Sequence, residues 1–98
     1  LIFDEIDTGV SGEIASLMGE MMQEISQTSQ LISISHLPQI ASKAKNHLKV
    51  VKTVINEQTV SSVVQLNKQQ RVEEIAKLLS GKKLSKAAID NAIELLNQ

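Results

Sequence analysis

The sequence has 98 residues, 42% of them hydrophobic, and its 10 basic and 11 acidic side chains give a net charge of -1. This length suits one small domain, or part of a larger one, whose core would be marginal by itself. The near-neutral charge excludes a global positive field that would hold nucleic acid or an acidic membrane surface.

The first expected element is a short buried strand at residues 1–3, which ends directly on Asp4 and Glu5. A run of turn-forming residues follows, and Ser11 can cap a helix over residues 13–27. The apolar residues of this helix recur at helical spacing and predict one buried face. They are Ile14, Leu17, Met18, Met21, Met22 and Ile25.

A second strand is predicted at residues 30–35, and it ends on His36. Strand, helix and strand form a βαβ unit, so the two strands should be parallel. Because functional groups in such sheets gather beyond the carboxyl ends of the strands, Asp4, Glu5 and His36 should share one edge. A short helix is expected next, over residues 38–44, since proline is tolerated in a first helical turn.

The rest of the chain predicts a β-hairpin and two helices. Residues 47–55 and 59–66 are rich in Val, Ile and Thr and flank a short polar link. A helix over residues 69–80 should end at Gly81, and Ser85 can cap a final helix. The fold class is therefore α/β: a parallel βαβ unit followed by a β-hairpin and C-terminal helices.

The adjacent carboxylates Asp4 and Glu5 favour magnesium chemistry at this edge. Like charges at a partly buried sheet edge are costly unless a cation balances them. In nucleotide hydrolysis one carboxylate holds Mg²⁺ and a second orients or deprotonates the attacking water. His36 could reach the same water from the neighbouring strand. The alternative is that each of these residues begins an ordinary solvated loop, which is the commoner role at an arbitrary strand end.

Other chemistries have less support. A zinc site would need better ligand spacing than His36 and His47 offer in a chain without cysteine. No serine lies in a Gly-x-Ser-x-Gly elbow, so a serine-histidine-aspartate triad is not indicated. We interpret Gln39, Arg71 and the basic pair 82–83 as solvated side chains.

Three segments resemble motifs of the ABC-type ATPases, a branch of the P-loop NTPases. Residues 1–5 resemble the end of a Walker B strand, residues 6–12 the D-loop that follows it, and residues 32–36 the strand carrying the switch histidine. Within that superfamily, Asp-Glu-Ile-Asp-Thr-Gly-Val-Ser-Gly and the later Ser-His-Leu-Pro-Gln-Ile-Ala are most similar to bacterial DNA repair proteins related to SMC and Rad50. The resemblance covers nearly the whole chain, and it implies that residues 1–98 form the C-terminal part of an ATPase head.

The resemblance implies a role for each motif residue. Asp4 would bind Mg²⁺, Glu5 would be the catalytic base, and His36 would sense the γ-phosphate of ATP. The D-loop would cross the interface to a second ATPase head in a homodimer and help to align the opposing nucleotide. Its residues would be Asp7, Thr8, Gly9, Val10, Ser11 and Gly12.

Several parts of a complete ATPase head have no counterpart in this sequence. No Gly-x-x-x-x-Gly-Lys-Ser/Thr run, the phosphate-binding Walker A motif, occurs, and the Q-loop and signature motif are missing as well. We therefore expect the chain to be a piece of a longer protein and to be inactive by itself. In isolation it should self-associate, because its sheet would expose an edge and an apolar face.

The resemblance implies that the parent protein hydrolyses ATP with Mg²⁺ and acts in DNA double-strand break repair and recombination, touching DNA through its other parts. A cytoplasmic, nucleoid-associated location is expected, and no apolar run approaches the roughly 20 residues that span a bilayer. Two alternatives stay open. The chain could be an ATP-independent interaction or dimerisation module, or the head of another ABC ATPase such as a transporter subunit.

Overall fold

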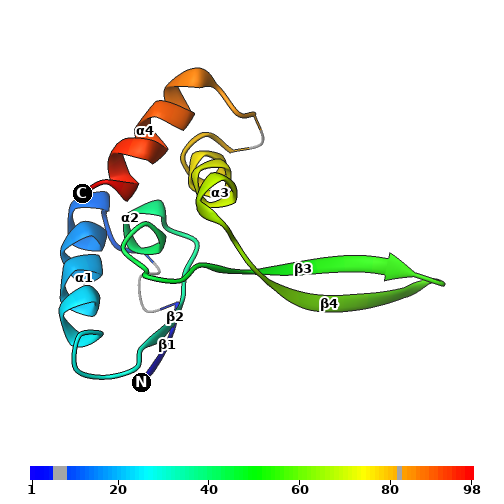
Figure 1. Ribbon diagram of the computed structural model, residues 1–98, viewed down its shortest axis with the longest axis horizontal. Helices are drawn as coiled ribbons and strands as arrows, with labels where there is room; N and C mark the ends of the chain where they lie inside the picture. Colours follow the sequence, from blue (N-terminus) through cyan, green and yellow to red (C-terminus); the bar gives the residue numbers. More distant parts are fainter. Residues whose placement is uncertain (6–8, 82) are drawn as a thin grey trace.

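The computed structural model describes residues 1–5, 9–81 and 83–98. A pair of short strands, three helices and a fourth one-turn helix form the body, and a long hairpin projects away from it (Figure 1). The elements in chain order are β1 (Ile2–Asp4), α1 (Gly12–Ile25), β2 (Ile32–Ile34), α2 (Pro38–Ala41), β3 (Leu48–Ile55), β4 (Gln58–Gln65), α3 (Lys68–Ser80) and α4 (Lys86–Leu96).

The predicted βαβ unit is confirmed, because β1 and β2 pair in parallel with Ile2 opposite Ile32 and Asp4 opposite Ile34. The strand expected over residues 30–35 is shorter, since its partner β1 offers only three residues for pairing. The side chains of Ile2, Ile32 and Ile34 lie on one face of this pair and are 71%, 49% and 52% exposed. Both faces of a parallel sheet are normally covered, so this face is an uncovered apolar surface.

The buried face of α1 differs from the prediction. Its buried residues are Ala15, Gly19 and Met22, and this side of the helix lies against α2. Three residues that were expected to be buried are exposed: Ile14, Leu17 and Met21. The prediction was wrong there because helical spacing identifies an apolar stripe but does not say which part of it a neighbour covers. Here the neighbour packs on the small residues.

A close approach of two backbones explains the glycine within α1. A Cβ atom added at Gly19 would lie 2.9 Å from the backbone oxygen of Gln39 and 3.1 Å from Cγ of Lys43. Helix α2 itself ends at Ala41 rather than near residue 44. The chain continues in tighter turns, in which the Lys43 N–H donates to the Ile40 carbonyl at 3.1 Å.

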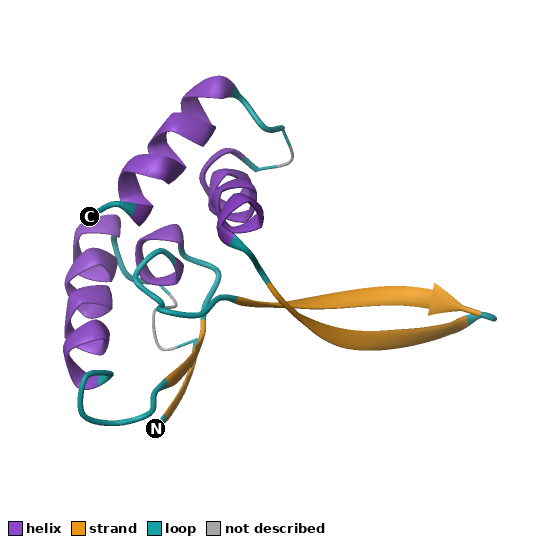
Figure 2. Cartoon of the chain, viewed as in Figure 1, coloured by secondary structure: helices purple, strands orange, loops and turns teal. Residues whose placement is uncertain are grey.

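The hairpin is confirmed, and its turn is tighter than expected. Strands β3 and β4 pair antiparallel along their full length, from Leu48 opposite Gln65 to Ile55 opposite Gln58. The linking residues Asn56 and Glu57 have φ angles of 51° and 64°. Two consecutive positive φ values are those of a type I′ turn, whose twist matches that of the strands. Most residues of the described hairpin are exposed, and the arm extends well beyond the helices (Figure 2).

Side-chain caps fix the starts of the helices. The Ile14 N–H donates to Ser11 Oγ at 3.4 Å, and the Ala88 N–H donates to Ser85 Oγ at 3.1 Å, so both predicted caps are confirmed. Helix α3 ends as expected at a glycine with a φ of 80°. Its start was missed by one residue, because Asn67 and Gln70 form a reciprocal capping box.

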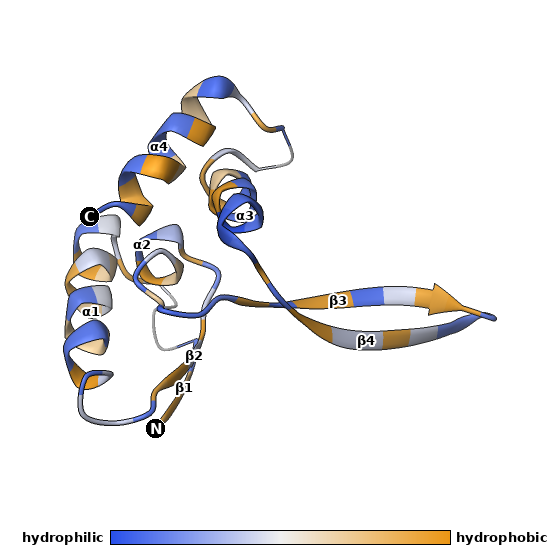
Figure 3. Ribbon diagram, in the orientation of Figure 1, coloured by the Kyte–Doolittle hydropathy of each residue, from blue (hydrophilic) through white to orange (hydrophobic). Residues whose placement is uncertain are grey.

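The largest buried cluster lies between α3 and α4 and consists of Ile75, Ala76, Ala88 and Ala92. Figure 3 shows apolar residues along the sides of both helices, as their spacing predicts. The surrounding half-buried side chains include Ala41 of α2, which connects the cluster to the rest of the body. No helix in the described ranges is long and apolar enough to cross a membrane.

The close contact between α1 and α2 predicts that Gly19→Ala is destabilising. Alanine gains about 1 kcal/mol in helix propensity over glycine, but a forced backbone displacement costs about 1–3 kcal/mol. We expect a net loss of up to about 2 kcal/mol and a lower Tm in thermal denaturation.

Gly12→Ala is the matched control on the same helix. Among the described residues, a Cβ atom there would meet only Nε2 of Gln39, at 3.4 Å, which is the end of a flexible side chain. Its Tm should therefore be unchanged or slightly raised. Equal Tm values for the two alanine variants would contradict the close packing at Gly19.

Candidate active-site edge

The carboxylates and the histidine singled out in the sequence follow the carboxyl ends of two paired strands. Asp4 is the last residue of β1, Glu5 comes next, and His36 lies two residues beyond the end of β2. Because Asp4 is paired with Ile34, the two strand ends are level with one another. All three side chains are exposed at the same edge of the parallel pair.

The backbone at Glu5 is both anchored and strained. Its N–H donates to the Ile34 carbonyl at 2.8 Å, which extends the strand pairing by one residue. Its φ is 50°, a left-handed conformation that costs a residue with a side chain about 1–3 kcal/mol. Such strain persists only where the surroundings impose it, and it is concentrated at functional sites. The geometry turns Glu5 sharply away from the strand direction directly after Asp4.

His36 is exposed between anchored neighbours. The Leu37 N–H donates to Ser35 Oγ at 3.1 Å, closing a small turn around the histidine. Ser35 and Leu37 are half-buried, and the next residue, Pro38, is buried. The main chain on both sides of the imidazole is therefore held while the ring faces solvent. Sequence reasoning missed this turn, because a serine at the end of a strand is too common to signal it.

The segment that resembles a D-loop is described only in part. Asp7 and Thr8 lie outside the described residues, together with Ile6 and, further along, Lys82. Gly9 has a φ of 81°, which glycine adopts without strain. The last residues of the segment belong to the start of α1: Ser11 caps the helix, and Gly12 is its first residue.

The donor set at this edge fits magnesium better than zinc. Within residues 1–5, 9–81 and 83–98, no group of three or more His, Cys, Asp or Glu side chains is placed to hold a metal ion. Protein zinc sites need three or four such ligands. Magnesium is commonly held by one or two carboxylates, with water and substrate phosphates completing its shell. Asp4, with Glu5 beside it, offers that smaller set of hard oxygen ligands.

The interpretation of Arg71 as a solvated side chain is wrong. This residue of α3 is half-buried, and its Nη2 donates to the carbonyls of Ala41 at 3.2 Å and Ser42 at 3.4 Å. Those carbonyls lie at the C-terminal end of α2, where a positive charge is favourable. The contact was not predictable from helical spacing, since Ala41 and Ser42 lie 30 and 29 residues before Arg71 in the chain.

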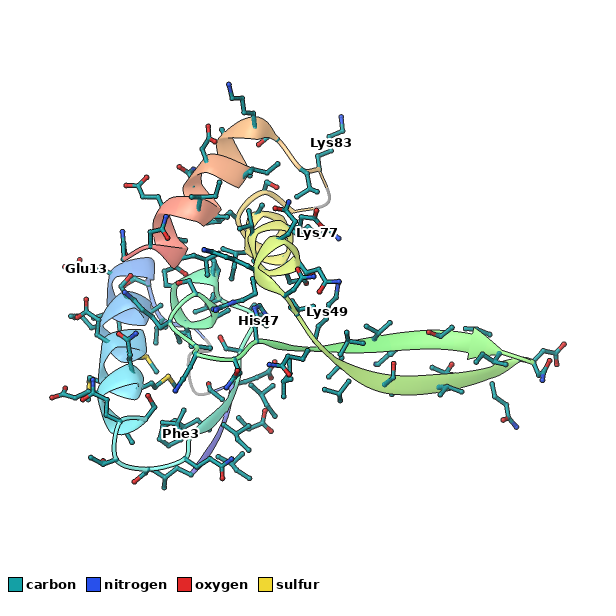
Figure 4. All side chains as sticks on the ribbon, viewed as in Figure 1. Phe3, Glu13, His47, Lys49, Lys77 and Lys83 are labelled. Carbon is teal, nitrogen blue, oxygen red and sulfur yellow. The ribbon has the colours of Figure 1, made fainter. Side chains whose placement is uncertain are left out.

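Polar side chains surround Arg71 at the base of the hairpin. Lys49 of β3 and Glu74 of α3 form an ion pair at 2.8 Å, and His47 lies beside Lys49 (Figure 4). Burial lowers the pKa of His47, and the charges of Arg71 and Lys49 lower it further, while Glu74 opposes the shift. Among the described residues, Nδ1 of His47 is buried without a hydrogen-bond partner.

The lowered pKa of His47 predicts a loss of stability in mild acid. The unfolded chain takes up a proton on this ring near pH 6.5, whereas the folded chain takes it up only at lower pH. Between those two pKa values the unfolded state binds more protons, so the free energy of unfolding falls as the pH is lowered through this window.

His47→Gln removes the titrating group. Between about pH 7.5 and about pH 5.5, the Tm of the natural chain should fall further than that of His47→Gln. Parallel falls of the two Tm values in matched buffers would show that His47 is not buried beside these cations.

The sequence matches no family model, but it is similar to several curated proteins named DNA repair protein RecN. The RecN of Rickettsia conorii is 45% identical over 97 residues, 99% of this chain. Those of Halalkalibacterium halodurans and Bacillus subtilis are each 40% identical, over 97 and 98 residues. The chain spans only 17–18% of the length of these relatives.

The fold has a counterpart among solved structures. An SMC ATPase, studied for its ATP-driven dimerization and DNA-stimulated activation, is similar with a TM-score of 0.64 over 85% of this chain and 48% of that one. At 22% identity this similarity concerns the fold alone, and it confirms the α/β class. With 40–45% identity over nearly its whole length, the chain is similar to one segment of RecN proteins from several bacteria.

Proposed function

We propose that this segment supplies the water-activating edge of an ATPase site in a longer, SMC-like DNA repair protein. The observation that carries the proposal is the geometry of the two strand ends. Glu5, whose backbone is strained, directly follows Asp4. Because β1 pairs with β2, these residues lie at the same end of the strand pair as the turn that carries His36. The relatives' function in DNA repair and the SMC-like fold support the same conclusion.

Each residue of the edge has a distinct part in the proposed site. Asp4 holds Mg²⁺, directly or through water, and Glu5 orients the attacking water and accepts its proton. His36 donates a hydrogen bond toward the γ-phosphate from the neighbouring strand end. When bound, ATP would supply the phosphoanhydride bond, and Mg²⁺ would neutralise the negative charge that develops as this bond breaks. The sequence has no Walker A run, so we propose that the isolated chain is inactive and that the phosphate-binding half comes from elsewhere in the parent protein.

The proposed site also needs a second head. Gly9 is exposed and precedes α1, in the segment that resembles a D-loop. A D-loop there would meet the opposing nucleotide. The solved SMC ATPase was studied for ATP-driven dimerization, which supports a homodimer of heads as the working form. We propose a cytoplasmic, nucleoid-associated protein that contacts DNA through its other parts.

The hairpin supports a second candidate function, that of an ATP-independent interaction module. Its strand pairing sets Val50 opposite Val63, and Val54 lies on the same face. These side chains are 61%, 64% and 71% exposed. An arm with an apolar face is suited to docking, so this function would be favoured if the complete protein neither bound nor hydrolysed ATP.

Replacing the proposed base tests the ATPase assignment. In the complete protein, Glu5→Gln should still bind ATP with Mg²⁺ but lose turnover by about 100-fold or more, because the amide cannot accept a proton. Asp4→Asn is the contrasting variant and should weaken Mg²⁺-dependent ATP binding itself. ATP hydrolysis with and without DNA, together with equilibrium ATP binding, distinguishes the two. Undiminished turnover in Glu5→Gln would exclude Glu5 as the base.

The uncovered face of the β1–β2 pair predicts self-association of the isolated chain. We propose that Ile2, Ile32 and Ile34 form the contact, since burying this face removes apolar surface from water. Light scattering at micromolar concentration should detect dimers or larger species, and Ile32→Glu should shift them toward monomer. Val54→Glu, on the hairpin, is the control and should leave the association unchanged. A monomeric natural chain would contradict the proposal.

A further inference from the structure

Helix α2 has little stability of its own. It contains four residues, and its N-cap, Leu37, makes no side-chain capping hydrogen bond. An isolated helix needs about 12–15 residues to be even marginally stable in water. Yet Pro38, Ile40 and Ser42, in or directly after this turn, are all buried. The position of α2 must therefore be set by the elements that pack around it.

One of those elements is α1. The absence of a side chain at Gly19 lets the backbone of α1 approach the Gln39 carbonyl closely. This contact limits how near α2 can come, but it involves no directional bond. It therefore limits the position of α2 on the side that faces α1 but does not fix it.

The directional contact comes from α3. Nη2 of Arg71 donates to the carbonyls of Ala41 and Ser42. The Ala41 carbonyl also accepts from the Ala44 N–H, at 3.3 Å, so the guanidinium adds a long-range contact to a local one. The guanidinium stays charged at neutral pH despite its partial burial, so it also interacts favourably with the C-terminal end of the helix. Ala41 packs against the α3–α4 cluster at the same place. Arg71 thus fixes the far end of α2.

The near end of α2 is next to His36. Only Leu37 separates the histidine from the first residue of the helix, and its N–H is bonded to Ser35 Oγ. Because consecutive Cα atoms are about 3.8 Å apart and the turn is closed, a displacement of α2 is passed on to His36. We propose that Arg71 is a positioning residue for His36: it holds α2 by its last carbonyls and thereby sets where the imidazole stands at the strand edge. This inference rests on the role proposed above for His36 in ATP hydrolysis.

The Lys49–Glu74 ion pair provides a matched comparison. It lies at the base of the hairpin and also involves α3, but it joins that helix to β3 instead of to α2. Its side chains are 38% and 21% exposed, so removing it costs stability at the junction without touching the helix that carries the histidine turn. A positioning role for Arg71 should be absent from Lys49.

The test uses the complete protein with the variants Arg71→Met, Arg71→Lys and Lys49→Met. Arg71→Met keeps an aliphatic stem but removes the donors, so kcat for ATP hydrolysis should fall roughly tenfold while KM for ATP changes less than about twofold. Arg71→Lys should recover part of the lost kcat. Lys49→Met should keep the natural kcat even if its Tm is lowered.

A double variant separates positioning from general destabilisation. If Arg71 acts through His36, then in the His36→Ala background Arg71→Met should cause little further loss of kcat. A readout without turnover is the NMR signal of ¹³C-labelled His36, identified by its loss in His36→Ala. This signal should shift in Arg71→Met and stay in place in Lys49→Met.

The possible outcomes are distinct. The positioning role alone would be overturned if the double variant lost kcat by the product of the two single-variant losses. An NMR signal of His36 that does not shift in Arg71→Met would overturn it as well. Natural turnover in His36→Ala would overturn the proposed role of that histidine and, with it, this inference. A lower kcat in Lys49→Met equal to that of Arg71→Met would show that the effect is one of junction stability, which also overturns it.

Discussion

The two halves of the described structure meet at a one-turn helix whose ends are held by different elements. On one side, α1 approaches α2 at Gly19, where two backbones lie close together. On the other, α3 and α4 reach it through Arg71 and the packing of Ala41. Because α2 is too short to hold its own shape, neither half can shift without altering it. The strand edge and the C-terminal helices therefore form one connected body.

The candidate site combines exposed side chains with a main chain that is held in place. Its side chains are exposed, but their backbones are not free: Glu5 is held by a ladder hydrogen bond in a left-handed conformation, and His36 stands in a closed turn. Fixed backbones with solvent-facing side chains suit a site that orients a water molecule for attack, since positioning is most of what phosphoryl transfer asks of a protein. The chain spans 17–18% of the length of its relatives, and we propose that the phosphate-binding half of the site comes from elsewhere in the parent protein.

Local signals predicted the elements well, whereas contacts distant in sequence were not predictable. The caps Ser11 and Ser85 and the hairpin are short-range features, and the structure reproduces them, although the hairpin turn is tighter than expected. The capping box at Asn67 was equally local and was overlooked. The role of Arg71 depends on partners about 30 residues away, and helical spacing alone cannot show it. The positive φ of Glu5 was likewise not predictable, because glutamate has no preference for that conformation.

The buried core of the described structure is small and is made mostly of small side chains. Of the seven buried hydrophobic residues in the described ranges, four are alanines, although 42% of the sequence is hydrophobic. Much of the larger aliphatic surface lies outside instead, on the hairpin and on the face formed by Ile2, Ile32 and Ile34. That face belongs to the same two strands whose ends present Asp4, Glu5 and the turn at His36. A partner surface that covers it would hold the strand pair from the opposite side, so burial of this face and the geometry of the candidate edge are physically coupled.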